Sequence, residues 1–172
     1  MATAGVKIQW KDKGLDKLVA QMKELTKLKA TVGYQGADAL ETLEPKGATT
    51  AAIATFNEFG TKHIPARGFM RRGVKRAGSD LARVAAKELG AVVSKNADPI
   101  DAMGEIGNVL AEKIIDQLDT TRSWATPNAA STIKKKGEQY PPLDAGKDRL
   151  RKGLSWAVRE NRYILKTGAP AK

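Results

Sequence analysis

The chain has 172 residues, no cysteine and a formal net charge of +11 at pH 7, and its length is typical of a single domain. The lack of cysteine excludes a disulfide framework and a thiolate metal site. No apolar run reaches the roughly 20 residues that cross a bilayer, and the first residues lack a segment of signal-peptide type. We therefore expect one domain, residues 1–172, made in a cytosol-like compartment.

The charge is distributed unevenly along the chain. Residues 61–95 hold nine Lys and Arg against two Asp and Glu, residues 96–119 hold one against six, and residues 120–172 hold twelve against four. These blocks could pair with one another within the fold. They could also form a surface for a polyanion or for an acidic protein face.

The first third of the chain predicts a strand, a helix and a second strand. Apolar and polar residues alternate over Val6–Trp10, as in a half-buried strand. From Leu15 to Leu28 the apolar residues recur at helical spacing. Lys29–Tyr34 reads as a strand, and the glycines and proline of Gln35–Thr49 predict a loop.

A short helix and a rigid loop are predicted next. Thr50 is a candidate N-cap for a helix that runs to Glu58, and Gly60 suits its C-terminal end. Ile64 precedes Pro65 and is therefore biased to extended geometry.

Two long helices are predicted to follow, over Phe69–Ser94 and Asp98–Thr120. In the second helix, Asp98 is a candidate N-cap and Pro99 occupies the first helical position. The expected buried stripe of the first helix is Val74, Ala77, Leu81, Val84, Ala85, Leu89 and Val92, and that of the second is Met103, Ile106, Leu110, Ile114 and Leu118.

The last third predicts a long irregular connection and a closing hairpin. Residues 120–146 contain several prolines and glycines, with one possible helical turn at Ser131–Lys135. Arg149 and Arg151 alternate with Leu150 along a candidate strand, and Leu154–Val158 and Tyr163–Leu165 read as two further strands. The predicted fold is therefore α+β: a small, mostly antiparallel sheet packed against the two long helices, with a long loop before the C-terminal hairpin.

The residues predict no catalytic, cofactor or metal site. His63 is the only histidine, and with no cysteine a metal site would depend on carboxylates. No serine lies in a G-x-S-x-G elbow. Gly146-Lys147 lacks the preceding glycine and following Ser or Thr of a phosphate-binding loop. Trp124 could anchor a partner or close its loop over the core.

Two stretches resemble a known family. The first is Ala51–Ala54, Asn57–Thr61, Ile64–Arg67 and Phe69–Arg71. The second is weaker and comprises Asn128, Ser131–Ile133, Lys136-Gly137, Leu143–Gly146, Leu150, Leu154–Trp156 and Val158. Together they resemble the tail-completion or neck (virion morphogenesis, minor tail component) proteins of long-tailed bacteriophages. Gly68 and Ala145 depart from the residues common in that family, which are proline and threonine.

The resemblance implies a structural virion protein and not an enzyme. Such proteins form a homo-oligomeric ring, by analogy of about six copies, at the head-proximal end of the tail. They join tail to head. The partners implied are tail terminator or tail tube proteins and connector or stopper proteins, with passing DNA as a non-specific charge partner and no membrane.

The interface residues expected from this reading lie in the first stretch or directly after it: Asn57, Glu58, Phe59, Gly60, Arg67, Phe69, Arg71 and Arg72. Gly60 would supply a positive φ, and Arg67 would offer its planar fork to a neighbour. We expect Arg67 to be more exposed than Phe59, because a guanidinium is buried only when it is paired. Alternatively, Phe56, Phe59 and Phe69 are the ordinary aromatic core of the domain.

Two alternative functions remain open at this stage. The chain could be a basic nucleic-acid-binding accessory protein, which salt-dependent retention of DNA would distinguish. Within the structural class it could be a tail terminator or a head–tail stopper.

Overall fold

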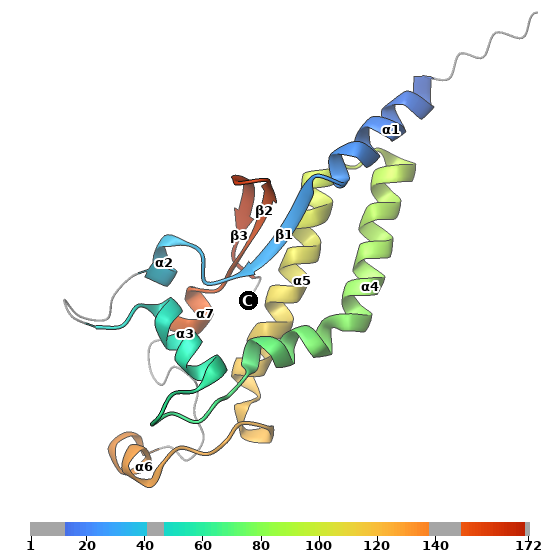
Figure 1. Ribbon diagram of the computed structural model, residues 1–172. Coiled ribbons are helices and arrows are strands. Elements are labelled where there is room, and N and C mark those ends of the chain that lie inside the picture. The colour runs from blue at the N-terminus through green and yellow to red at the C-terminus, as the bar shows by residue number, and fades with distance from the viewer. Residues whose placement is uncertain (1–12, 41–46, 138–148, 171–172) are drawn as a thin grey trace, which may run out of the picture.

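The computed structural model describes residues 13–40, 47–137 and 149–170. Its longest elements are two helices that lie side by side, α4 (Phe69–Lys95) and α5 (Pro99–Asp119), and a small sheet that packs on α5 (Figure 1). The remaining elements are α1 (Lys13–Leu25), β1 (Leu28–Gly33), α2 (Ala37–Leu40), α3 (Thr50–Phe59), the 3-10 helix η1 (Thr121–Ser123), α6 (Ala130–Lys136), α7 (Arg149–Lys152), β2 (Ser155–Glu160) and β3 (Tyr163–Gly168).

The sheet is antiparallel, with the strand order β1-β2-β3. Leu28 pairs with Glu160 and Gly33 with Ser155, so the first strand of the described chain joins the C-terminal hairpin. The hairpin turns at Asn161, whose φ of 53° lies in the left-handed region that asparagine tolerates. This arrangement confirms the predicted α+β class with its antiparallel sheet and two long helices.

Helix α5 is the centre of the molecule, because the sheet packs on one side of it and α4 on another (Figure 1). Small residues make both contacts close. A Cβ at Gly104 would lie 3.1 Å from the Trp156 ring, and a Cβ at Gly73 would lie 2.7 Å from the backbone of Ile114. The core around α5 consists of Leu28, Ala54, Phe69, Ala111, Ile114, Ile115, Leu118, Leu150, Leu154, Trp156 and Val158.

The helix termini follow their capping residues. Asp98 accepts hydrogen bonds from the backbone N–H groups of Ile100 and Asp101, and Pro99 begins α5, both as predicted. Helix α3 is capped by Thr49 and not by Thr50, so it begins one residue earlier than predicted. The connection from Asp119 to Ser155 holds only the short helices η1, α6 and α7 in its described part.

Two predictions about individual segments were wrong. Arg149–Lys152 is a helical turn, α7, so Arg149 and Arg151 do not share one face of a strand. Val74 is half exposed and does not belong to the buried stripe of α4, in which Ala77 and Val92 are the fully buried members. The strand predicted at Val6–Trp10 lies outside the described residues.

Among the described residues, no helix is both long enough and apolar enough to cross a membrane.

Candidate functional site

The loop between α3 and α4 is held in one tight geometry by local hydrogen bonds. Gly60 ends α3 with a φ of 78°, and a Cβ there would lie 2.8 Å from the backbone nitrogen of Ala66. Thr61 donates its N–H to the Ile64 carbonyl at 2.8 Å, and its hydroxyl oxygen accepts the N–H groups of His63 and Ile64. The glycine is therefore required on two grounds, the positive φ and the close approach of the returning chain.

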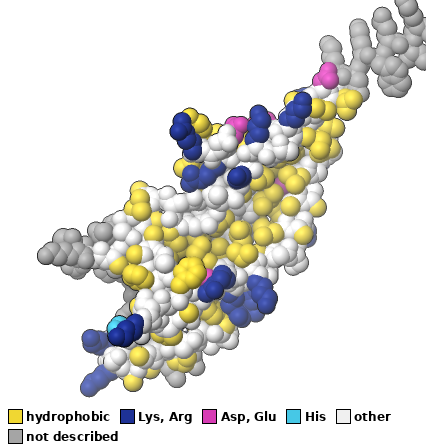
Figure 2. All heavy atoms as spheres, in the orientation of Figure 1, with side chains coloured by type: hydrophobic (Ala, Val, Ile, Leu, Met, Phe, Trp, Pro, Cys, Tyr) yellow, Lys and Arg dark blue, Asp and Glu magenta, His cyan; other side chains and the backbone are white. Residues whose placement is uncertain are grey.

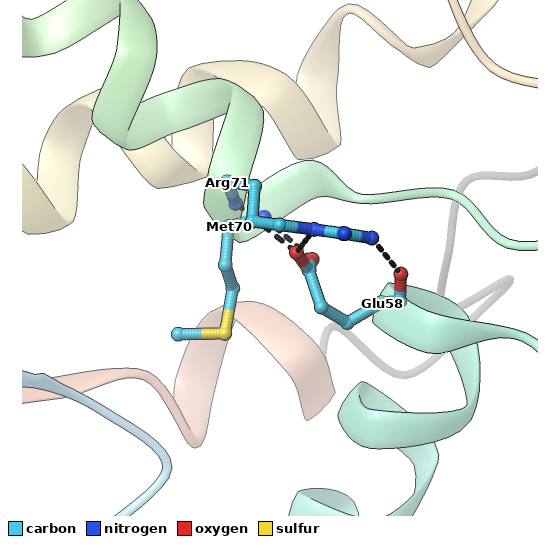
Figure 3. A network of polar contacts seen from close by, with 3 residues as sticks. All are labelled: Glu58, Met70 and Arg71. Atoms are coloured by element: carbon cyan, nitrogen blue, oxygen red, sulfur yellow. Dashed lines mark hydrogen bonds and ion pairs between the residues drawn. The ribbon is translucent and has the colours of Figure 1, made fainter.

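Glu58 joins the end of α3 to the start of α4 (Figure 3). Glu58 is buried, with only 4% of the residue exposed to solvent. Its carboxylate accepts hydrogen bonds from the backbone N–H groups of Met70 and Arg71, at 2.9 and 3.2 Å, and from Arg71 Nε at 2.8 Å. Arg71 Nη2 also donates to the Glu58 carbonyl at 2.8 Å. The side chain of Met70 points away from this network, so only its backbone takes part.

Glu58 thereby replaces a missing N-cap. Gly68 precedes α4 and has no side chain to satisfy the first N–H groups of the helix. The Glu58 carboxylate supplies those acceptors from a neighbouring helix, and its negative charge lies at the positive end of the α4 dipole.

Arg67 is buried, and the expectation that it is more exposed than Phe59 was wrong. Arg67 is 6% exposed and Phe59 is 67% exposed. Arg67 Nε donates to the Thr126 carbonyl at 2.9 Å, and its Nη2 donates to the Pro127 carbonyl and to Asn128 Oδ1. Burial lowers the pKa of the Arg67 guanidinium. Arg67 is an internal strut that fastens the segment after α5 to the loop before α4.

Phe59 is the exposed feature of this region. The Arg71 guanidinium lies over its ring, 5.3 Å from the centroid, and the residue is 67% exposed. The ion pair with Glu58 fixes the Arg71 guanidinium, and the guanidinium in turn stacks on the Phe59 ring. Phe56, one turn earlier on α3, is also exposed. The arrangement presents aromatic surface with a cation at its edge.

Arg72 contacts α5 and the segment that follows it. Its Nε donates to Oε1 of the buried Gln117 at 3.1 Å, and its guanidinium lies 5.2 Å from the Trp124 ring. Trp124 Nε1 donates to the Gln117 carbonyl at 3.2 Å. Trp124 thus closes its loop over the core, which was one of its two predicted roles.

The predicted interface residues therefore divide into two groups. Glu58, Arg67 and Phe69 are buried, and Phe69 packs edge-on against Tyr34 in the core. Asn57 donates its side-chain amide to the Ile53 carbonyl and accepts the Arg67 N–H at its backbone. Phe59 and Arg71 are exposed and available to a partner. The acceptors of Arg67, in residues 126–128, were not predicted, and no local sequence signal marks them.

The site offers binding surface and no evident reactive group. Glu58 is occupied by its hydrogen bonds to α4, and His63 is exposed in the loop. Among the residues that the structure describes, no group of three or more His, Cys, Asp or Glu side chains is placed to hold a metal ion.

Comparison with known proteins identifies no relative: no protein-family profile, no curated protein and no solved structure matches the chain.

Proposed function

We propose that this protein is a structural component of a phage virion, a ring-forming tail-completion or neck protein that joins the tail to the head. The proposal begins from the resemblance of the segment 51–71 to that family. Besides further copies of this chain, the resemblance implies two sets of partners. These are the tail terminator or tail tube proteins on one side of the ring and the connector or stopper proteins on the other. Its place would be the virion neck, after synthesis in the host cytoplasm.

The observation that carries the proposal is the way Phe59 is presented. Phe59 is 67% exposed and Phe56, three residues earlier on α3, is 40% exposed, so two aromatic rings share one exposed face of the helix. The ring stands at the last residue of α3, and hydrogen bonds of Glu58 and Arg67 and the positive φ of Gly60 fix the chain around it. A fixed, exposed aromatic flanked by arginine is the kind of anchor that dominates protein–protein interfaces.

The decisive experiment is electron microscopy of a lysate from a phage that lacks this chain. A tail-completion protein predicts DNA-filled heads and separate tails of normal length. Tails of uncontrolled length would indicate a terminator, and empty heads would indicate a connector or stopper. A map of the neck in which the chain is absent, or present as one copy, would contradict the ring.

The second candidate function is binding of nucleic acid by the isolated protein. Exposed basic side chains follow one another on the first turns of α4, at Arg71, Lys75 and Arg76. Such a surface would retain DNA with an affinity that falls steeply with salt. Retention of DNA by the isolated protein at about 0.15 M salt would favour this candidate over the neck protein.

A further inference from the structure

The exposed aromatic residues of α3 form one surface with the first turns of α4. The Arg71 guanidinium lies over the ring of Phe59, and Lys75 is exposed one helical turn after Arg71. Phe56 adds a second exposed ring on the same face of α3. Figure 2 shows hydrophobic side chains beside a group of Lys and Arg side chains where α3 meets α4. We call Phe56, Phe59, Arg71 and Lys75 the Phe59 patch.

The Phe59 patch carries positive charge that no exposed carboxylate of its own segment offsets. Glu58 is the single carboxylate between residues 51 and 79, and it is buried against the start of α4. The side chain of Arg71 remains 64% exposed although it pairs with Glu58. A partner for this patch must therefore supply apolar surface for the rings and negative charge at their edge.

A pocket with these two properties lies near the other end of the long helices. It has a volume of about 840 Å³, and its walls come from the later turns of α4, the first turns of α5 and the strands β2 and β3. A volume of this size is typical of pockets that enclose a small molecule or a few side chains. Ala97, Ala102 and Trp156 contribute apolar wall. We call it the acidic pocket, because four of its lining residues are carboxylates: Glu88, Asp98, Asp101 and Glu105.

The carboxylates of the acidic pocket are only partly neutralised within the chain. Lys166 is the one cationic residue in the lining, and its Nζ bonds to Asp101 at 2.6 Å. Glu88 pairs with Lys87, whose side chain is 78% exposed. The side chain of Glu105 has neither a hydrogen bond nor an ion pair with any other described residue. The pocket therefore keeps a net negative charge beside its apolar wall.

The patch and the pocket are too far apart to meet within one chain. Arg71 lies on the first turn of α4, and Glu88 lies about 25 Å further along the same helix. Figure 1 shows the junction of α3 with α4 and the turn from α4 to α5 at opposite ends of the helix pair. Two copies arranged head to tail bring the patch of one to the pocket of the next.

We propose that the Phe59 patch of one copy docks into the acidic pocket of a second copy. In this contact Phe59 packs against the apolar wall, and Arg71 and Lys75 lie against the carboxylates. The inference rests on the proposed ring and names the two surfaces that close it. Because the two surfaces differ, the contact is heterologous, and such a contact generates a ring when its rotation closes.

The test is sedimentation of the isolated protein with charge reversals in the two surfaces. Lys75→Glu and Glu105→Lys, both at exposed positions, should each weaken self-association by about tenfold, because each brings like charges together. The double variant, with both substitutions in one chain, restores opposite charges and should associate more tightly than either single variant. Lys29→Glu makes the same charge change at an exposed position of β1 and should leave association unchanged. Its neighbour Ala30 faces α5, so Lys29 lies on the other face of the sheet.

Truncation of the aromatic anchor gives a second measure. Phe59→Ala should weaken self-association by at least about tenfold. Leu40→Ala, on α2, removes an apolar side chain of the same 67% exposure and should leave association unchanged. Melting curves like that of the parent establish that each variant is folded.

Several results would overturn the proposal. The first is a parent protein whose self-association is weaker than a Kd of about 1 mM. The second is a double variant that associates less than both single variants, and the third is an equal loss with Lys29→Glu. Association that stops at the dimer would contradict the head-to-tail arrangement. The result is separable from the neck function: a ring that forms through other surfaces leaves that function standing, and joined particles in the null lysate overturn the function alone.

Discussion

The carboxylate of Glu58, on the last turn of α3, accepts a 2.8 Å hydrogen bond from Nε of Arg71, on the first turn of α4. The same carboxylate caps the backbone of α4, whose preceding residue Gly68 has no side chain. The pair therefore serves two purposes. It begins the longest helix of the molecule and fixes the cation that stacks on Phe59.

Replacing Glu58 should destabilise the fold strongly. Glu58→Ala removes the acceptors of two backbone N–H groups and of Arg71, which should lower the free energy of unfolding by about 2–4 kcal/mol. Glu58→Gln retains one acceptor oxygen and should lose less. Urea denaturation measures both. Glu105→Ala, at an exposed position of α5, is the control and should change stability by less than about 0.5 kcal/mol.

Arg67→Ala should also destabilise the protein, by about 2–3 kcal/mol, because it removes three hydrogen bonds from a charged donor. Thermal denaturation of Arg67→Ala beside Phe59→Ala measures the contrast. The Phe59 variant should melt close to the parent, since the ring is mostly exposed. The reverse order of melting temperatures would contradict the assignment of Arg67 as the strut.

Phe59→Ala should instead reduce function. If Phe59 anchors a partner in the neck, its truncation should lower the yield of joined particles in a complementation assay while the protein remains folded. Leu15→Ala removes an exposed apolar side chain on α1, away from this loop, and is the matched control. A normal yield of joined particles with Phe59→Ala would show that Phe59 does not take part in the interface.

Two glycines of α4 should respond in opposite directions to alanine. A Cβ at Gly73 would lie 2.7 Å from Ile114, so Gly73→Ala must push α4 away from α5 and should cost about 1–3 kcal/mol. A Cβ at Gly78 meets nothing within 4 Å, so Gly78→Ala should stabilise the helix by about 0.5–1 kcal/mol. Chemical denaturation of the two variants distinguishes close packing from helix propensity.

The ion pair between α4 and α5 should make stability depend on acid pH. Hydrogen bonds from Lys113 and Arg83 lower the pKa of Asp80. A lowered carboxyl pKa contributes stability above the ordinary aspartate value near 4 and loses it as the pH falls through the folded-state pKa. Asp80→Asn should therefore flatten the melting temperature below about pH 4 relative to the parent. Parallel curves for the two proteins would show that Asp80 does not contribute.

Local signals were sufficient for much of the fold. The Asp98-Pro99 pair marks the start of α5 because both its capping and its fixed φ act within one turn. The short apolar runs at Leu154–Val158 and Tyr163–Leu165 similarly predicted the hairpin of β2 and β3. The wrong prediction of a strand at Arg149–Arg151 also came from a local pattern. One apolar residue between two arginines is compatible with a strand or with a helical turn, and the structure shows the helical turn α7 with Leu150 buried.

The candidate site depended on contacts between distant residues. The acceptors of Arg67 lie about 60 residues further along the chain, at Thr126 to Asn128. No local pattern could therefore predict its burial. The role of Glu58 also required knowledge of where α4 begins relative to α3. Only the motif around Phe59 was visible in the sequence, and it did not show which of its side chains face outward.

The register of β1 with β2 has a consequence for synthesis on the ribosome. Gly33 pairs with Ser155, so 122 residues must be translated after β1 before its partner strand exists. At about 5–20 residues per second, the interval is roughly 6–24 s. During that time β1 lacks its partner strand β2, while α4 and α5 are being translated. Nascent chains on one messenger could therefore meet through unpaired β1 strands, and a chaperone that shields this segment would act before the C-terminal hairpin arrives.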